Sequence, residues 1–161
     1  MTVVSDTGPI HYLLLLGVER LLPDLFREVL VPPAVLRELP AANAPEIVKR
    51  WAERPPEWLL VDAPKEVLAL FRLDPGETEA ISLAKELSGF LLCDDKRAIE
   101  VARQAGILSF GTLGVLQRGH ALKKIEIDPL LEALTRTNYR HTAALFARVS
   151  EEAHRMRLSE G

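Results

Sequence analysis

The stretch TVVSDTGPI, residues 2–10, decides the fold that the sequence predicts. Its β-branched residues favour a short strand, and Gly8–Pro9 ends the extended run before an apolar helix begins at Ile10. Asp6 therefore follows the carboxyl end of the first strand, which is where open α/β sheets bind ligands. An acid in this place can also simply cap the next helix, so Asp6 alone does not distinguish a site from a cap.

The same arrangement of strand, polar residue and helix recurs along the chain. FLLCDD, residues 90–95, places Asp94 and Asp95 after a buried strand, and ILSFGT, residues 107–112, places Thr112 as a cap or as a hydroxyl near a ligand. Further strands are expected at 28–33 and 58–64, and helices at 10–16, 18–26, 34–39, 45–53, 65–71, 75–88, 96–105, 128–136 and 141–156.

This alternation predicts an α/β fold, a three-layer α/β/α sandwich around a central parallel sheet of about five short strands. The chain is expected to form a single domain, residues 1–161, in which residues 127–161 are a helical C-terminal extension.

Two acids stand on the apolar faces of predicted helices. Glu38 shares its face with Ala34 and Val35, so it is an acid on the side that should be buried. In LDPGETEAISLAKELSG, Asp74 is a natural N-cap and Glu77 either completes a capping box or points into the buried stripe. The residues leave both interpretations of Glu77 open.

The bulk composition excludes several classes of protein. A chain of 161 residues with 48% hydrophobic content can form a proper core, and a net charge of −3 gives no strong basic field. The single cysteine, Cys93, rules out an intramolecular disulfide and favours a reducing, cytoplasmic compartment. No basic leader or membrane-spanning run is expected. The histidines are scattered and are expected at the surface: His11, His120, His141 and His154.

Right-handed crossovers place the carboxyl ends of parallel strands on one edge of the sheet, so Asp6, Asp94 and Asp95 should share that edge. Glu38 and Glu77 lie on helices that can lean over it. Four or five carboxylates in one pocket repel each other, and a hard divalent cation such as Mg²⁺ or Mn²⁺ would relieve the repulsion. The sequence contains no glycine-rich phosphate loop and no nucleophile elbow.

The motifs SDTGPI, VPPAVLREL, DPGETEAISLAKEL, LLCDD and GTLGVL, in this order, resemble the PIN domain nucleases, and most closely the branch found beside bacterial and archaeal antitoxins. The resemblance extends from residue 3 to about residue 150. It implies that Asp6, Glu38, Glu77 and Asp95 are the catalytic acids that hold Mg²⁺ or Mn²⁺.

The resemblance also implies that Asp94 could share the metal-binding role of Asp95, and that the hydroxyls of Thr7 and Thr112 could support the ligands. Two positions depart from the family pattern. Gly8 stands where a Ser or Asn often occurs, and the third acid, Glu77, is a Glu where Asp is commoner.

The function implied by the resemblance is a metal-dependent, single-strand-specific endoribonuclease, the toxin of a toxin–antitoxin pair, acting as a homodimer. Basic residues that could receive the RNA backbone are Lys96, Arg97, Arg118, Lys123, Lys124, Arg136 and Arg140. Two alternatives remain. One is a degenerate PIN domain that only binds RNA or a protein. The other is a different Mg²⁺-dependent phosphoryl-transfer domain, a receiver or phosphatase, which would need a second acid close to Asp6.

Overall fold

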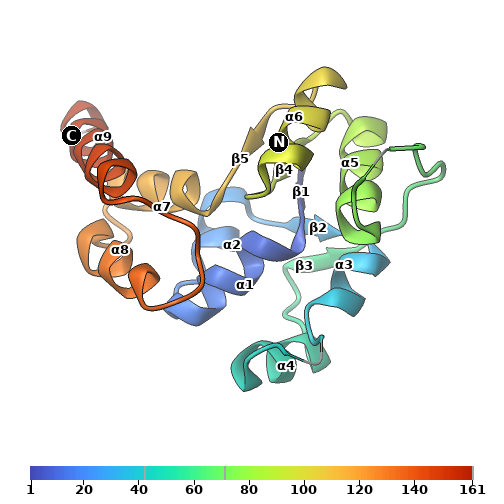
Figure 1. Ribbon diagram of the computed structural model, residues 1–161, viewed down its shortest axis with the longest axis horizontal. Coiled ribbons are helices and arrows are strands. Elements are labelled where there is room, and N and C mark those ends of the chain that lie inside the picture. The colour runs from blue at the N-terminus through green and yellow to red at the C-terminus, as the bar shows by residue number, and fades with distance from the viewer. Residues whose placement is uncertain (42, 71, 161) are drawn as a thin grey trace.

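The computed structural model describes residues 1–41, 43–70 and 72–160, and its centre is a five-stranded parallel sheet (Figure 1). The strands are short: β1 (Val3–Ser5), β2 (Val29–Val31), β3 (Leu59–Val61), β4 (Phe90–Leu92) and β5 (Ser109–Phe110). Their order in the sheet is β3-β2-β1-β4-β5. The chain therefore moves outward in one direction from β1 to β3 and in the other from β4 to β5. The strand order reverses between β1 and β4, where open α/β sheets form their binding crevice.

Helices cover both faces of this sheet. They are α1 (Thr7–Leu16), α2 (Leu21–Phe26), α3 (Pro33–Glu38), α4 (Glu46–Glu53), α5 (Pro75–Leu87), α6 (Lys96–Gln104), α7 (Thr112–Ala121), α8 (Ile127–Thr135) and α9 (Ala143–Glu160). On one face α5 packs against β1 and β4, with α6 beside it; on the other, α2 packs against β2 and α7 against β5, with α1 against α7. This is the predicted three-layer α/β fold with a parallel sheet of five strands.

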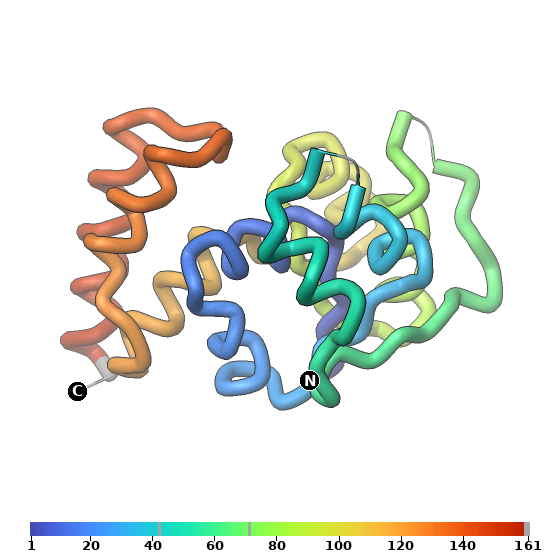
Figure 2. Tube along the Cα trace, turned by 90° about the horizontal axis from the view of Figure 1, so that it is seen from below, coloured from blue at the N-terminus to red at the C-terminus, as the bar shows by residue number. Residues whose placement is uncertain are grey.

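The last two helices form an antiparallel hairpin that packs on α7 at one end of the molecule (Figure 2). α7 therefore contacts both β5 and the hairpin. The domain boundary placed at residue 127 stays a prediction. None of the helices in the described part of the chain is both long and apolar enough to cross a membrane.

The core explains why the strands carry continuous apolar runs. Val3, Val4, Leu91 and Leu92 are all fully buried, because β1 and β4 lie at the middle of a sheet covered on both faces. Asp6, the residue directly after β1, is nevertheless only 7% exposed. A carboxylate is thus held at the edge of this core.

The α5 segment has the termini that its sequence predicts. The Glu77 N–H donates to Asp74 Oδ1 at 2.7 Å, and the Asp74 N–H donates to Glu77 Oε1 at 3.1 Å, so the capping box is complete. Ser88 takes the left-handed conformation at the other end, just before Gly89. The capping interpretation of Glu77 is therefore confirmed.

The helix predicted at 65–71 is wrong for residues 65–70, which form no helix; Phe71 lies outside the described residues. The Lys65 N–H donates to Glu86 Oε2 at 2.8 Å and the Leu68 N–H to Ser82 Oγ at 2.9 Å. Side chains of α5 accept these hydrogen bonds, so the segment follows α5 in an extended path.

The expected surface position of the histidines is wrong for His120, which is fully buried on α7. Its Nδ1 accepts the Ile127 N–H at 3.1 Å, and its Nε2 lies 3.1 Å from His154 Nδ1. The opposite nitrogen of His154 lies 2.8 Å from Asp128 Oδ2. Residues far apart in sequence meet here because α9 folds back onto α7.

Candidate metal and nucleic-acid site

The acids that follow β1 and β4 lie side by side at the carboxyl edge of the sheet. The two strands pair in parallel with Ser5 opposite Leu92, and the Asp6 N–H donates to the Leu92 carbonyl at 2.8 Å. Asp6 occupies the N-cap position of α1 but makes no side-chain capping hydrogen bond. Its carboxylate is therefore available for interactions other than capping.

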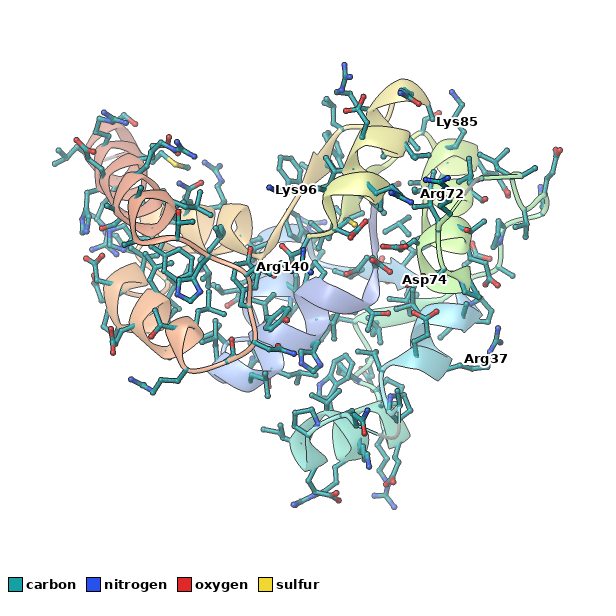
Figure 3. All side chains as sticks on the ribbon, viewed as in Figure 1. Arg37, Arg72, Asp74, Lys85, Lys96 and Arg140 are labelled. Carbon is teal, nitrogen blue, oxygen red and sulfur yellow. The ribbon has the colours of Figure 1, made fainter. Side chains whose placement is uncertain are left out.

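Carboxylate oxygens of Asp6, Glu38 and Asp74 all lie within 4.8 Å of one another. The three acids come from the end of β1, the end of α3 and the start of α5 (Figures 1 and 3). Within the described residues, this is the one group of three His, Cys, Asp or Glu side chains whose ligand atoms approach so closely. Oxygen atoms of three carboxylates form a donor set suited to Mg²⁺ or Mn²⁺.

Glu38 is held in this group by two hydrogen bonds. The Thr7 hydroxyl donates to Glu38 Oε2 at 3.1 Å, and the Gly76 N–H donates to Glu38 Oε1 at 2.8 Å. A Cβ at residue 76 would displace the Glu38 carboxylate from this position, so the glycine between Asp74 and Glu77 lets Glu38 approach the group. The hydrogen bond from Thr7 to Glu38 favours the supporting role expected of that hydroxyl, which stays a prediction.

The electrostatics of the group disfavour three negative charges. Burial raises the pKa of Asp6 to about 7, the charges of Asp74 and Glu38 add to the rise, and the Thr7 N–H opposes it. Burial also raises the pKa of Glu38, again with the charge of Asp74 contributing. A bound divalent cation would favour the ionised forms that the metal-free protein disfavours, so the residues present fit such an ion.

Glu77 and Asp95 lie close to this group but are used as caps. Glu77 accepts the Asp74 N–H, and Asp95 Oδ2 accepts the Ala98 N–H at 3.0 Å at the start of α6. Burial raises the pKa of Glu77 to about 7, with contributions from the charges of Asp74, Asp6 and Asp95. Glu77 and Asp95 thus lie at the acid edge, by which we mean the carboxyl edge of the sheet with its carboxylates. The group of three close carboxylates contains Asp74 and neither of these two residues.

Sequence reasoning assigned Asp74 only a capping role. The signal that could have found it is DPGE itself: an acid two residues before a glycine, at the start of a helix whose next acid was already a candidate. The approach of Glu38 from α3 gives Asp74 its second role, and that approach is a tertiary contact.

Asp94 has different partners from the other acids. Its Oδ1 accepts the Thr112 N–H at 2.7 Å and the Tyr139 hydroxyl at 3.3 Å, and its Oδ2 accepts the Thr112 hydroxyl at 2.6 Å. Burial raises its pKa, while the donors from Thr112 and Tyr139 oppose the rise. Thr112 therefore supports Asp94, and Asp94 joins the start of α7 to the loop before α9.

Cys93 packs directly against the acid group. It is fully buried, its thiol lies 3.6 Å from Asp6 Oδ2 as a donor, and burial together with the Asp6 charge raises the thiol pKa. The thiol is consequently kept protonated, which suits a structural residue and not a nucleophile.

The predicted basic residues divide into two groups. Lys96 and Arg97 lie exposed in the first turn of α6, directly after Asp95, and Arg140 follows Tyr139. Figure 3 shows Lys96 and Arg140 near the middle of the view, with Asp74 to their right. The others lie on or beyond α7 and α8, away from the acid group: Arg118, Lys123, Lys124 and Arg136.

The length of α7 separates Lys123 and Lys124 of this second group from the acid group. α7 begins at Thr112 beside Asp94 and has ten residues, so Lys123 and Lys124 lie about 15 Å or more away. Arg136 pairs with Glu132 at 3.2 Å. Sequence reasoning missed Arg72, an exposed residue with positive φ two positions before Asp74.

A family model described as PIN domain matches residues 2–155. The chain therefore belongs to the PIN domain family, and the resemblance of its motifs to that family is confirmed, while the likeness to the branch found beside antitoxins stays a prediction. The receiver or phosphatase alternative is excluded by this assignment. No match was found among curated proteins.

Among solved structures, the chain is similar to a PilT N-terminus domain protein from the hyperthermophilic archaeon Sulfolobus solfataricus, with a TM-score of 0.53 and 17% sequence identity. The similarity covers 88% of this chain and 100% of the other. At this identity the comparison supports the fold alone.

Proposed function

We propose that the protein is a Mg²⁺- or Mn²⁺-dependent endoribonuclease that hydrolyses single-stranded RNA. The observation that carries the proposal is the group of Asp6, Glu38 and Asp74, whose oxygens converge within 4.8 Å at the point where the strand order reverses. Membership of the PIN domain family supports a nucleic acid as the substrate.

In this proposal each acid has a stated role. Asp6, Glu38 and Asp74 hold the cation. Glu77 and Asp95 complete the acidic set around it, as the effect of Asp6 and Asp95 on the pKa of Glu77 supports. When bound, the ion would acidify a water molecule and neutralise charge on the scissile phosphate. The protein side chains orient that phosphate, while Thr7 and Gly76 keep Glu38 in place.

The test is hydrolysis of a labelled single-stranded RNA by the purified protein. Cleavage is expected with millimolar Mn²⁺ or Mg²⁺ and none with EDTA. Asp6→Asn should abolish cleavage, while Asp24→Asn, an exposed aspartate on α2, should cleave like the parent. Cleavage that persists in EDTA or in Asp6→Asn would overturn the proposal.

A second candidate is a PIN domain that binds RNA without cleaving it. The observation that favours it is the use of both Glu77 and Asp95 as helix caps, which leaves three of the acids converging. RNA binding with no Mn²⁺-dependent cleavage would select this candidate.

The biological role that we propose is that of a cytoplasmic toxin neutralised by an antitoxin, acting as a homodimer. Expression should arrest growth, Asp6→Asn should relieve the arrest, and co-expression of an antitoxin-like reading frame, where one is found next to this gene, should restore growth. Light scattering should give about twice the 17.9 kDa chain mass, and a monomer at working concentration would contradict the dimer.

A further inference from the structure

Asp94 occupies a cradle that is shaped for its carboxylate. A Cβ at Gly111 would lie 2.6 Å from Asp94 Oδ1, and a Cβ at Gly8 would lie 3.3 Å from Asp94 Oδ2. Gly111 is also the N-cap of α7 and has no side chain to cap it, so Asp94 supplies the acceptor for the Thr112 N–H. The contact at Gly111 is the tighter of the two, whereas a Cβ at Gly8 would need only a small shift of the Asp94 carboxylate.

The third donor to Asp94 comes from a distant part of the chain. Tyr139 lies in the loop between α8 and α9, and its hydroxyl reaches Asp94 Oδ1 at 3.3 Å. The ring of Tyr139 packs edge-to-face on Tyr12 with centroids 4.9 Å apart, and the Tyr12 hydroxyl donates to Asn138 Oδ1 at 2.8 Å. Two tyrosine hydroxyls therefore fasten this loop, Tyr139 to Asp94 and Asn138 to Tyr12 of α1.

His141, which follows Arg140, is fixed as well. The ring of His141 stacks on Phe146 with centroids 4.7 Å apart, and its Nδ1–H donates to the Tyr139 carbonyl at 2.9 Å. Arg140 thus stands between two anchored side chains. Among the described residues it is exposed and has no ion-pair or hydrogen-bond partner for its guanidinium, unlike Arg136 earlier in the same loop.

This placement matters because the acid edge repels RNA. The phosphate backbone must approach a group of carboxylates in a protein of net charge −3, so cations beside that group have a disproportionate effect on binding. An arginine can bind a phosphate through two parallel hydrogen bonds.

We propose that Asp94 is a positioning residue that, through Tyr139, holds Arg140 at the acid edge to contact the RNA backbone. The Thr112–Asp94–Tyr139 junction then joins the α8–α9 hairpin to the site, and Asp94 is not a metal ligand. The inference rests on the proposed function only in taking the bound strand to be single-stranded RNA.

The first test measures RNA binding in EDTA, by fluorescence anisotropy with a labelled 20-nucleotide single-stranded RNA of mixed sequence. Tyr139→Phe and Arg140→Ala are each expected to weaken binding about fivefold, and the double variant also about fivefold, because both changes remove the same contact. Each should lower the slope of log K against log salt by about one unit. Arg155→Ala, at an exposed arginine on α9, is the matched control and should bind like the parent.

Independent effects would overturn the proposal: a loss of about 25-fold in the double variant, or an unchanged salt slope in Tyr139→Phe. So would a parent protein that binds no RNA. A parent that binds RNA but does not cleave it with Mn²⁺ would overturn the proposed nuclease and leave this inference standing.

The second test needs no RNA. In Tyr139→Phe and Asp94→Asn, amide hydrogen exchange in peptides covering 136–142 should accelerate about tenfold, while α5 peptides stay unchanged. The Mn²⁺-induced rise in Tm should be kept in both variants. Unchanged exchange in the loop of Tyr139→Phe, or loss of the Mn²⁺ response in Asp94→Asn, would overturn the positioning role. Tyr139→Phe carries the test if Asp94→Asn fails to fold.

Discussion

Asp6 and Asp94 follow neighbouring strands and lie at the same edge of the sheet, yet their surroundings differ. Asp6 faces two other carboxylates and receives no capping hydrogen bond, whereas Asp94 accepts three hydrogen bonds from Thr112 and Tyr139. Burial raises the pKa of both and hydrogen-bond donors oppose the rise at both, but only at Asp6 do the charges of Asp74 and Glu38 add to it. Protein donors stabilise the charge of Asp94, whereas the charge of Asp6 requires a cation.

The largest expected effect comes from exchanging these two acids for amides. Asp6→Asn should lower Mn²⁺-dependent RNA hydrolysis at least about a hundredfold and remove most of the Mn²⁺-induced rise in Tm, because it removes a ligand. The metal-free variant should be more stable than the parent, by about 1 kcal/mol, since one repelling charge is gone. Thermal melts in EDTA and in millimolar Mn²⁺ measure both effects.

Asp94→Asn is the comparison for that experiment. It should keep the Mn²⁺ response while losing stability in EDTA, because an amide cannot accept all three donors as well. A retained Mn²⁺ response in Asp6→Asn would show that Asp6, like Asp94, is not a metal ligand.

The second expected effect is on the pH dependence of stability. The pKa of Asp6 is about 7 in the folded protein and near 3.8 when unfolded, so the folded state binds more protons between these values. Its contribution to the free energy of unfolding is therefore present at low pH and is lost as pH rises towards 7. Between pH 5 and pH 7 the metal-free protein should lose about 2 kcal/mol from this group.

Urea unfolding at pH 5, 6 and 7 in EDTA measures this change. Asp6→Asn should show a smaller decrease over the same range, and excess Mn²⁺ should reverse the trend because the cation competes with protons. A metal-free parent that becomes more stable from pH 5 to pH 7 would contradict the pKa of Asp6.

The third expected effect is on the hydrogen bond from the Thr112 hydroxyl to Asp94. Thr112→Val keeps the volume and removes one donor to Asp94 Oδ2, leaving a carboxylate lone pair unsatisfied. The expected loss is about 1–3 kcal/mol of unfolding free energy, with the Mn²⁺ response retained. Thr112→Ser, which restores the hydroxyl, should recover most of the stability. Equal stability of the valine and serine variants would show that this hydrogen bond contributes little.

The smallest effect is expected at Glu77. Glu77→Gln retains the acceptor for the Asp74 N–H, so the capping box survives and the unfolding free energy should change by less than about 0.5 kcal/mol. RNA hydrolysis separates its two roles: a large loss of rate at unchanged stability would place Glu77 in the acidic set, and an unchanged rate would leave it as a cap.

The sequence predicted the features that depend on neighbouring residues. Strand-then-acid patterns at Asp6, Asp94 and Asp95, together with right-handed crossovers, indicated one sheet edge, and the capping box at Asp74 and Glu77 was legible from spacing alone. Residues 65–70 show where prediction from neighbouring residues fails. Side chains of α5 accept hydrogen bonds from N–H groups of this segment, and no local sequence pattern indicates this.

Only the tertiary structure decided which acids share a site and which have donors of their own. Glu38 meets Asp74 because α3 packs against α5, and Asp94 meets Thr112 and Tyr139, which follow it by 18 and 45 residues. His120 is buried for the same reason, since α9 returns onto α7. Periodicity and capping are determined by residues a few positions apart, whereas the charge state of a carboxylate depends on every donor and charge within a few ångströms, and folding alone brings these together.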